Sequence, residues 1–152
     1  MAPPMTKREQ RVLSGITKVL GPVHSFIYRA SGGRLGANFS YGAPIVLLTT
    51  KGRKSGEPRT TPLIYLQDGE RIIVVASKGG FPTNPGWYLN LQAHPDVEIQ
   101  LGTNITKLRA RTASAEEKAR YWPRLCEIYP PYQGYQDRTD RPIPVVILEP
   151  AR

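Results

Sequence analysis

Short runs of apolar residues, separated by turns, indicate a chain built largely of β-strands. The strand predicted at Ile45 to Thr50 begins with β-branched residues and leucine without interruption, which is typical of a strand covered on both faces. Thr60 to Gln67 alternates more loosely and meets Asp68-Gly69, a strong hairpin signal, before a second strand returns at Arg71 to Ala76. Further strands are predicted at Asp96 to Leu101, at Ile105 to Arg111 and at Ile143 to Leu148.

Apolar residues at helical spacing predict two helices near the N-terminus. An amphipathic helix is predicted to begin at Lys7 and to end at Gly21-Pro22. Its apolar residues recur at i, i+4, i+7 and i+8, namely Val12, Ile16, Val19 and Leu20. A second, short helix is predicted from Val23 to Ala30. These helices could pack on the core, or the first one, which also carries basic residues, could contact a membrane or cap the active site.

Two later helices are predicted from their capping residues. Asn84 is the expected N-cap of a helix in which Pro85 takes the first position, and His94-Pro95 should stop it. Ser114 and Glu117 form a capping box at the start of another helix, which should end at a pair of prolines, Pro130-Pro131.

The number and order of these elements define the expected fold. About six strands, mostly joined by hairpins, with peripheral helices, indicate an α+β fold with an antiparallel or mixed barrel. At 152 residues the chain fits a single domain. Within it we expect residues 1–43 to form an N-terminal tail with amphipathic helices and residues 44–152 to form the barrel.

The loop after the first strand has the chemistry of a phosphate cradle. Glycines let backbone N–H groups turn toward an anion, and hydroxyl and cationic side chains surround them. These residues are Thr50, Lys51, Gly52, Arg53, Lys54, Ser55, Gly56 and Arg59, and we call the segment from Lys51 to Arg59 the basic loop. Neither the GxxxxGK[ST] nor the GxGxxG motif is present, and a solvated hairpin loop fits the pattern equally well.

Two further segments carry polar chemistry. Ser77 to Gly80 is a second small cationic turn, which could add a hydroxyl, a charge and backbone donors to the same site. Tyr129, Tyr132 and Tyr135 recur every third residue, a spacing that can line one side of a helical turn with phenols. The alternative is that these tyrosines only pack, with their hydroxyls in water.

Composition narrows the class of ligand. The formal charge of +9 and the 39% hydrophobic content describe a basic globular protein drawn to anions, whether nucleic acid, lipid surface or phosphorylated ligand. Cys126 is the single cysteine, so an internal disulfide is excluded and a reducing cytoplasm is favoured. Cys126 itself is expected to be a small apolar residue of the core. His24 and His94 have no second ligand at useful spacing, so no metal site is expected. No segment approaches the ~20 apolar residues of a membrane span.

Five separated blocks of the sequence resemble one known family. LLTTKGRKSGEPRTTPL, VVASKGG, NPGWYLNLQAHP, YWPRLCEIYPPYQGYQ and TDRPIPVVILEP are similar, in order and spacing, to the deazaflavin-dependent nitroreductase family, actinobacterial reductases that use coenzyme F-420. The resemblance runs from about Pro44 to Pro150. It implies a split β-barrel related in shape to FMN-binding pyridoxamine-phosphate oxidases, with reduced F-420 as the hydride donor.

The resemblance also implies which residues contact the coenzyme. The phosphate and oligoglutamate tail would lie against Arg53, Lys54, Ser55 and Arg59. The deazaflavin ring would lie by Thr60, Thr61, Pro62, Leu63 and Ile64 and by Val75, Ala76, Ser77 and Lys78. The remaining contacts would come from Gly86, Trp87, Tyr88, Leu89 and Asn90.

Hydride transfer to a conjugated acceptor leaves negative charge on an oxygen, which hydrogen-bond donors must face. The candidate catalytic residues are Ser77, Tyr129, Tyr132 and Tyr135, with Tyr132 as the first choice. Ile64 stands where nitroimidazole-activating relatives can carry tyrosine, which puts that activity, but not the coenzyme, in question.

Three functional hypotheses follow. The first is an F-420-dependent reductase of quinones, enones or nitroaromatics. It would be located in the cytoplasm, either in solution or associated with the inner face of the membrane. The second is a nucleic-acid-binding barrel, although the basic residues cluster at two turns and no RNP-type motif is present. The third is a non-catalytic carrier of F-420.

Overall fold

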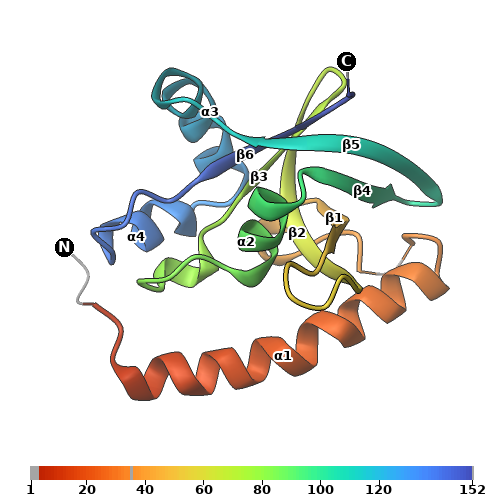
Figure 1. The fold of residues 1–152 in the computed structure, drawn as a ribbon. Helices are drawn as coiled ribbons and strands as arrows, with labels where there is room; N and C mark the ends of the chain where they lie inside the picture. Colours follow the sequence, from red (N-terminus) through yellow and green to blue (C-terminus); the bar gives the residue numbers. More distant parts are fainter. Residues whose placement is uncertain (1–3, 35, 152) are drawn as a thin grey trace.

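A closed antiparallel barrel forms the centre of the molecule (Figure 1). The computed structural model describes residues 4–34 and 36–151, without the side chains of residues 13–19. In this part of the chain, six strands pair in the order β1-β2-β3-β6-β5-β4, and every pair is antiparallel. They are β1 (Ile45–Lys51), β2 (Pro58–Asp68), β3 (Arg71–Val75), β4 (Asp96–Leu101), β5 (Asn104–Thr112) and β6 (Val145–Glu149). The predicted α+β barrel is confirmed.

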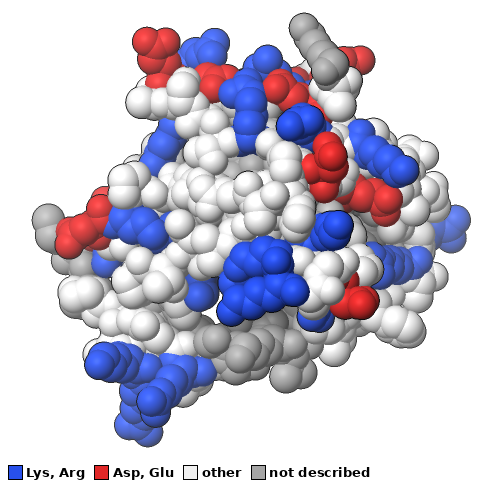
Figure 2. All heavy atoms as spheres, in the orientation of Figure 1, with Lys and Arg blue, Asp and Glu red and all other residues white. Residues whose placement is uncertain are grey.

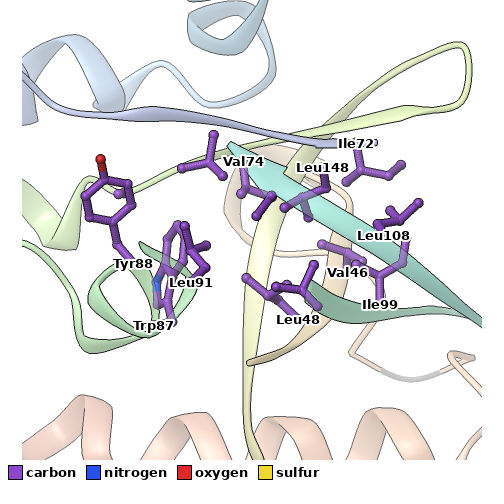
Figure 3. Close-up of a cluster of buried hydrophobic side chains, with 14 residues drawn as sticks. Val46, Leu48, Ile72, Val74, Trp87, Tyr88, Leu91, Ile99, Leu108 and Leu148 are labelled. Carbon is purple, nitrogen blue, oxygen red and sulfur yellow. The ribbon is translucent and has the colours of Figure 1, made fainter. Parts of the chain in front are cut away.

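Strand β1 is buried on both faces, as its apolar run predicts. Val46 and Leu48 are both 0% exposed and point into the barrel, while Ile45 and Leu47 pack outside it with Tyr28. Figure 3 shows the interior filled by side chains from the strands and from α2 (Gly86–Ala93), labelled Val46, Leu48, Ile72, Val74, Trp87, Tyr88, Leu91, Ile99, Leu108 and Leu148. The barrel is therefore a packed core, and ligands must bind at its surface.

Two helices cover one outer wall of the barrel. They are α3 (Ala115–Ile128) and α4 (Pro131–Asp137), and their apolar residues pack against the outward side chains of β3 and β6. The predicted capping box is present, since the Ser114 side chain accepts from the Glu117 backbone N–H and the Glu117 side chain accepts from the Ser114 N–H. Cys126 is half-buried beside this cluster, and burial raises the pKa of its thiol.

The prediction of two N-terminal helices is wrong. A single helix, α1 (Lys7–Ala30), continues through Gly21-Pro22. Pro22 removes one backbone donor, but the C-terminal half is fixed by Tyr28, which is 2% exposed and accepts a hydrogen bond from the Gly102 N–H at 2.7 Å. Packing therefore overrides the local cost of proline. Ile16 and Val19 of the predicted apolar stripe lie outside the described side chains.

The predicted cap of α2 is also wrong. The helix begins one residue later than expected, with Pro85 as its N-cap and no side-chain capping bond. The side-chain oxygen of Asn84 instead accepts from Arg141 at 2.7 Å, because a long-range partner competes for it. Short 3-10 turns occupy Ser40–Gly42 (η1) and Lys78–Gly80 (η2).

Helix α1 runs beneath the barrel in Figure 1, on the side away from α3. Among the described residues, no helix combines the length and apolar character needed to cross a membrane.

Candidate active site

The basic loop is a tight turn closed by its own backbone. The Gly52 N–H donates to the Glu57 carbonyl and the Gly56 N–H donates to the Gly52 carbonyl, both at 2.8 Å. A Cβ atom on Gly52 would lie 2.7 Å from the Ser55 hydroxyl and 3.1 Å from the Glu57 carbonyl oxygen, so a larger residue there would have to displace these neighbours. Gly56 has φ +73°, in the left-handed region. The glycines shape the loop, but both of their N–H groups donate within it, so the prediction that these N–H groups turn toward an anion is wrong and the side chains remain as the donors.

Helix α2 holds the basic loop through Asn90. The Asn90 side-chain oxygen accepts from the Arg53 backbone N–H at 3.2 Å and from the Arg53 guanidinium at 2.9 Å. Its amide nitrogen donates to the Thr50 hydroxyl at 3.2 Å. Asn90 is 6% exposed, so its rotamer is fixed by packing. The structure thus brings together two residues, Arg53 and Asn90, that lie far apart in the sequence and were both predicted to bind coenzyme.

The cations of the basic loop are not neutralised by any ion pair within the described part of the chain. Among the described residues, none of the side chains of Lys51, Arg53, Lys54 and Arg59 forms an ion pair. Figure 2 shows Lys and Arg side chains gathered at the centre of the view, over the loop between β1 and β2. The donor set therefore fits a ligand with phosphate and carboxylate groups. Over the described part of the chain, no cluster of His, Cys, Asp or Glu could hold a metal ion.

Strand β2 continues from the basic loop along the predicted ring-binding residues. The Thr60 hydroxyl bonds the Thr49 hydroxyl at 2.8 Å and accepts from the Arg29 guanidinium at 2.7 Å. Arg29 lies in the last turn of α1, and the sequence analysis did not identify it. The remaining predicted residues of this strand, Thr61, Pro62, Leu63 and Ile64, are half-buried, so each keeps surface for a ligand.

Several other predicted coenzyme residues are largely buried. Val75 and Ala76 are 5% and 0% exposed, so they could offer only backbone atoms to a ligand. Trp87 and Tyr88 pack in the barrel core, and the Tyr88 hydroxyl bonds the Thr112 hydroxyl at 2.8 Å. Gly86 is exposed and Leu89 half-buried at the surface of α2.

The three predicted tyrosines form one cluster. The rings of Tyr129 and Tyr132 are 5.0 Å apart, edge to face, and the Tyr129 and Tyr135 hydroxyls bond each other at 3.0 Å. Tyr132 is 4% exposed, but among the described residues its hydroxyl has no hydrogen-bond partner and is not fully shielded from solvent. Burial raises the pKa of Tyr129 and of Tyr132 above the ordinary tyrosine value, so both phenols stay protonated at neutral pH.

Two aromatic residues that the sequence analysis missed extend this cluster. Phe39 and Tyr41 place their rings 6.1 Å and 5.7 Å from that of Tyr129. They are 48% and 70% exposed, although both are large and apolar. Tyr41 also has φ 63°, which is uncommon for a residue other than glycine.

The second cationic turn meets the tyrosine cluster. Gly80 in η2 packs so closely on α4 that a Cβ atom there would lie 2.8 Å from the Tyr135 carbonyl oxygen. Ser77, which immediately precedes η2, is half-buried, and Lys78 is exposed with its ammonium group 3.2 Å from the Thr83 hydroxyl. The turn therefore packs against the backbone of α4, the helix that bears Tyr132 and Tyr135, and leads on the other side into α2.

Comparison with known proteins identifies first the class and then the family. The barrel is that of the split-barrel class: a candidate pyridoxamine 5'-phosphate oxidase of Listeria innocua shares the fold with a TM-score of 0.53 at 16% identity, over 71% of this chain and 84% of that one. The family model for F-420H(2)-dependent quinone reductase matches residues 22–150. The chain belongs to this family of enzymes.

Individual relatives agree with that assignment. An F-420H(2)-dependent quinone reductase of Mycobacterium tuberculosis is 45% identical over 83% of this chain and 87% of its own. A solved F-420-H2-dependent reductase, FDR-A, has a TM-score of 0.65 at 46% identity, covering 70% of this chain and 94% of that one. A further structure, described as a domain-swapped dimer, has a TM-score of 0.68 at 39% identity, over 84% and 96% of the two chains.

Proposed function

We propose that this protein reduces a quinone-type acceptor with reduced coenzyme F-420, and that the coenzyme binds along the basic loop, β2 and the start of α2. The observation that carries this placement is the pairing of Arg53 with Asn90, which fixes a cationic loop that has no ion-pair partner among the described residues. Cations held in place beforehand bind an anionic tail at lower entropic cost.

The coenzyme side of the site is assigned by surface and charge. Arg53, Lys54 and Arg59, with the Ser55 hydroxyl, would hold the phosphate and carboxylates of the tail. The half-buried residues Thr61 to Ile64 would lie against the ring. When bound, the reduced deazaflavin supplies a hydride, and the role of these residues is to bind and orient its carrier.

The acceptor side is assigned to the phenols of Tyr129, which caps the C-terminal end of α3, and of Tyr132 and Tyr135 in α4. Tyr132 would donate to the acceptor oxygen that gains negative charge, because its hydroxyl has no partner among the described residues. The Tyr129 and Tyr135 hydroxyls already bond each other at 3.0 Å, so one of the two donors is used internally. Ser77, beside η2, could supply a second donor to the same oxygen.

An acceptor-dependence assay tests the proposed reaction. Reduced F-420 should be oxidised by the protein when menadione, a small quinone without an isoprenoid tail, is present and should remain reduced without it. Recovery of F-420 absorbance and fluorescence measures the rate, with heat-inactivated protein as the control. Binding of F-420 without turnover of any quinone, enone or nitroaromatic would instead indicate a carrier. Tight binding of nucleic acid that falls steeply with salt would support a nucleic-acid-binding barrel.

A second proposal concerns α1, which presents apolar and basic side chains to solvent. Phe26 is 73% exposed, and four other large apolar residues of this helix are also exposed, namely Val12, Leu20, Val23 and Ile27. Lys7, Arg8 and Arg11 are exposed near its N-terminal end, where Figure 2 shows a second group of cations at the lower left. We propose that α1 lies on an anionic lipid surface, where lipid-soluble quinones reside.

Vesicle sedimentation tests this contact. The protein should pellet with vesicles that contain anionic lipid and remain in solution with neutral ones. Phe26→Ser combined with Leu20→Ser should weaken vesicle binding about 100-fold or more, given ~1.5–3 kcal/mol for each large apolar side chain removed from water. If the double variant binds vesicles as well as the parent but has a higher KM for menadione, α1 caps the active site instead.

A further inference from the structure

Arg141 lies in the segment before β6 and donates five hydrogen bonds. Its guanidinium contacts the carbonyl oxygens of Ala76, Ser77 and Phe81 and the side-chain oxygen of Asn84, at 2.7 to 3.2 Å. None of these partners is a carboxylate. Arg141 is half-buried, and burial lowers its pKa from the usual arginine value. Within the part of the chain that the structure describes, its charge is therefore compensated by oriented dipoles rather than by an ion pair.

All of these acceptors belong to one short stretch, from the end of β3 to the start of α2. This stretch includes η2, where Lys78, Gly79 and Gly80 have φ of 45°, 61° and 80°. A run of left-handed residues, one of them not glycine, is costly and persists only where surrounding contacts fix it. Arg141 supplies those contacts, because its planar fork reaches the stretch on both sides of η2 at once.

The backbone of Arg141 is tied to the phenol-bearing helix. Its carbonyl oxygen accepts from the Gln136 side chain of α4 at 2.9 Å. The same Gln136 side chain accepts from the Ile143 backbone N–H, also at 2.9 Å. Arg141 thus contacts the turn that bears Ser77 through its guanidinium and the helix that bears Tyr132 and Tyr135 through its backbone.

We infer that Arg141 is a positioning residue that sets the spacing between the turn bearing Ser77 and the phenols of α4. This inference rests on the proposed function, in which Ser77 of the turn and Tyr132 of α4 would donate to the same oxygen of the acceptor. Hydride transfer depends steeply on the distance between reacting atoms, so a small displacement of the turn costs rate. Lysine cannot replace arginine here, because an ammonium group cannot reach acceptors spread across a planar fork.

The test compares Arg141→Lys with Arg111→Lys. Arg111 is a matched control: its guanidinium makes a bidentate contact with Glu117 and a bond to Glu149, on the outer wall of the barrel and away from the proposed site. Both variants should lower the unfolding temperature. Only Arg141→Lys should lower kcat, by about 10- to 100-fold, and weaken F-420 binding. Asn84→Ala, which removes one of the acceptors, should act in the same direction with a smaller effect, and it serves if Arg141→Lys folds poorly.

A readout without coenzyme separates this inference from the proposed function. Backbone amides of Gly80 and Phe81, which bond within the turn, should exchange with deuterium faster in coenzyme-free Arg141→Lys than in the parent or in Arg111→Lys. If exchange is unchanged and kcat and F-420 affinity match those of the control, Arg141 is structural only and the inference is wrong. If exchange is faster in Arg141→Lys but the parent protein binds no F-420, the proposed function is wrong, while the conclusion that Arg141 holds the turn in place is supported.

Discussion

Replacing Arg53 and Lys54 together by alanine should weaken F-420 binding about 100-fold. Hydrogen bonds to charged groups contribute ~1.5–3 kcal/mol each, and the loss of two at the lower end of this range corresponds to a factor of that size. Both residues are exposed, and the Arg53 backbone N–H can still bond to Asn90, so loss of the guanidinium bond should lower the unfolding temperature by no more than about 4 °C. Fluorescence titration of F-420 measures the affinity, and a thermal melt measures the stability.

The matched control is Lys107→Ala with Arg109→Ala. These residues are exposed on β5, so the control removes the same two kinds of charge outside the basic loop. It should leave F-420 affinity within about 2-fold, because charges beyond a Debye length of ~8 Å are screened at physiological salt. Equal weakening in both double variants would mean that net charge, and not the basic loop, attracts the coenzyme.

Tyr132→Phe should lower kcat about 100-fold and leave F-420 affinity unchanged. The substitution removes the hydroxyl and keeps the ring, which packs against Tyr129 and Tyr135. Loss of one donor that faces a developing oxyanion costs ~10²- to 10³-fold in kcat. Stopped-flow oxidation of reduced F-420 by menadione measures the rate of the chemical step directly.

Tyr121→Phe provides the control for this substitution. Its hydroxyl donates to the Asp68 carboxylate at 2.6 Å, between α3 and β2, so its loss should lower stability without lowering kcat. If the kcat of Tyr132→Phe equals that of the parent, Tyr132 is not the hydrogen-bond donor to the acceptor, and Ser77 is the next candidate.

The pH dependence gives an independent check on the same donor. Burial raises the pKa of Tyr132 above its ordinary value near 10, so the donating, protonated form persists as pH rises. Accordingly, kcat should not fall between about pH 6 and 9, and a decline should begin only above about pH 10. A midpoint near pH 7 to 8 in the parent, absent from Tyr132→Phe, would contradict a phenol with a raised pKa.

The barrel could be predicted from the sequence because its determinants are local. The apolar run of β1, the Asp68-Gly69 hairpin and the Ser114–Glu117 capping box each specify an element by themselves, and the structure contains all three. The continuation of α1 through Pro22 could not be predicted. Its stability depends on the hydrogen bond between Tyr28 and Gly102, which lie 74 residues apart in the sequence.

The charge of the candidate site could be predicted from the sequence, but the contacts that hold its segments in place could not. Glycine, hydroxyl and cationic residues in one loop identified the basic loop, whose geometry fits an anion. Arg141 gave no signal, because most of its partners are backbone carbonyls, some 65 residues distant in sequence, and any residue can supply a carbonyl. The prediction of Asn84 as a helix N-cap was wrong for the same reason, because its hydrogen bond to Arg141 joins residues 57 positions apart in the sequence.

A fluorescence titration of F-420 with the purified protein, with FMN as the control ligand, tests the central claim most directly. The account predicts selective quenching of F-420 at micromolar protein and no comparable binding of FMN, because FMN carries the phosphate but lacks the oligoglutamate tail that the free cations of the basic loop would bind. Equal affinity for the two ligands would contradict the assigned role of those cations. No binding of F-420 would contradict the proposed function itself.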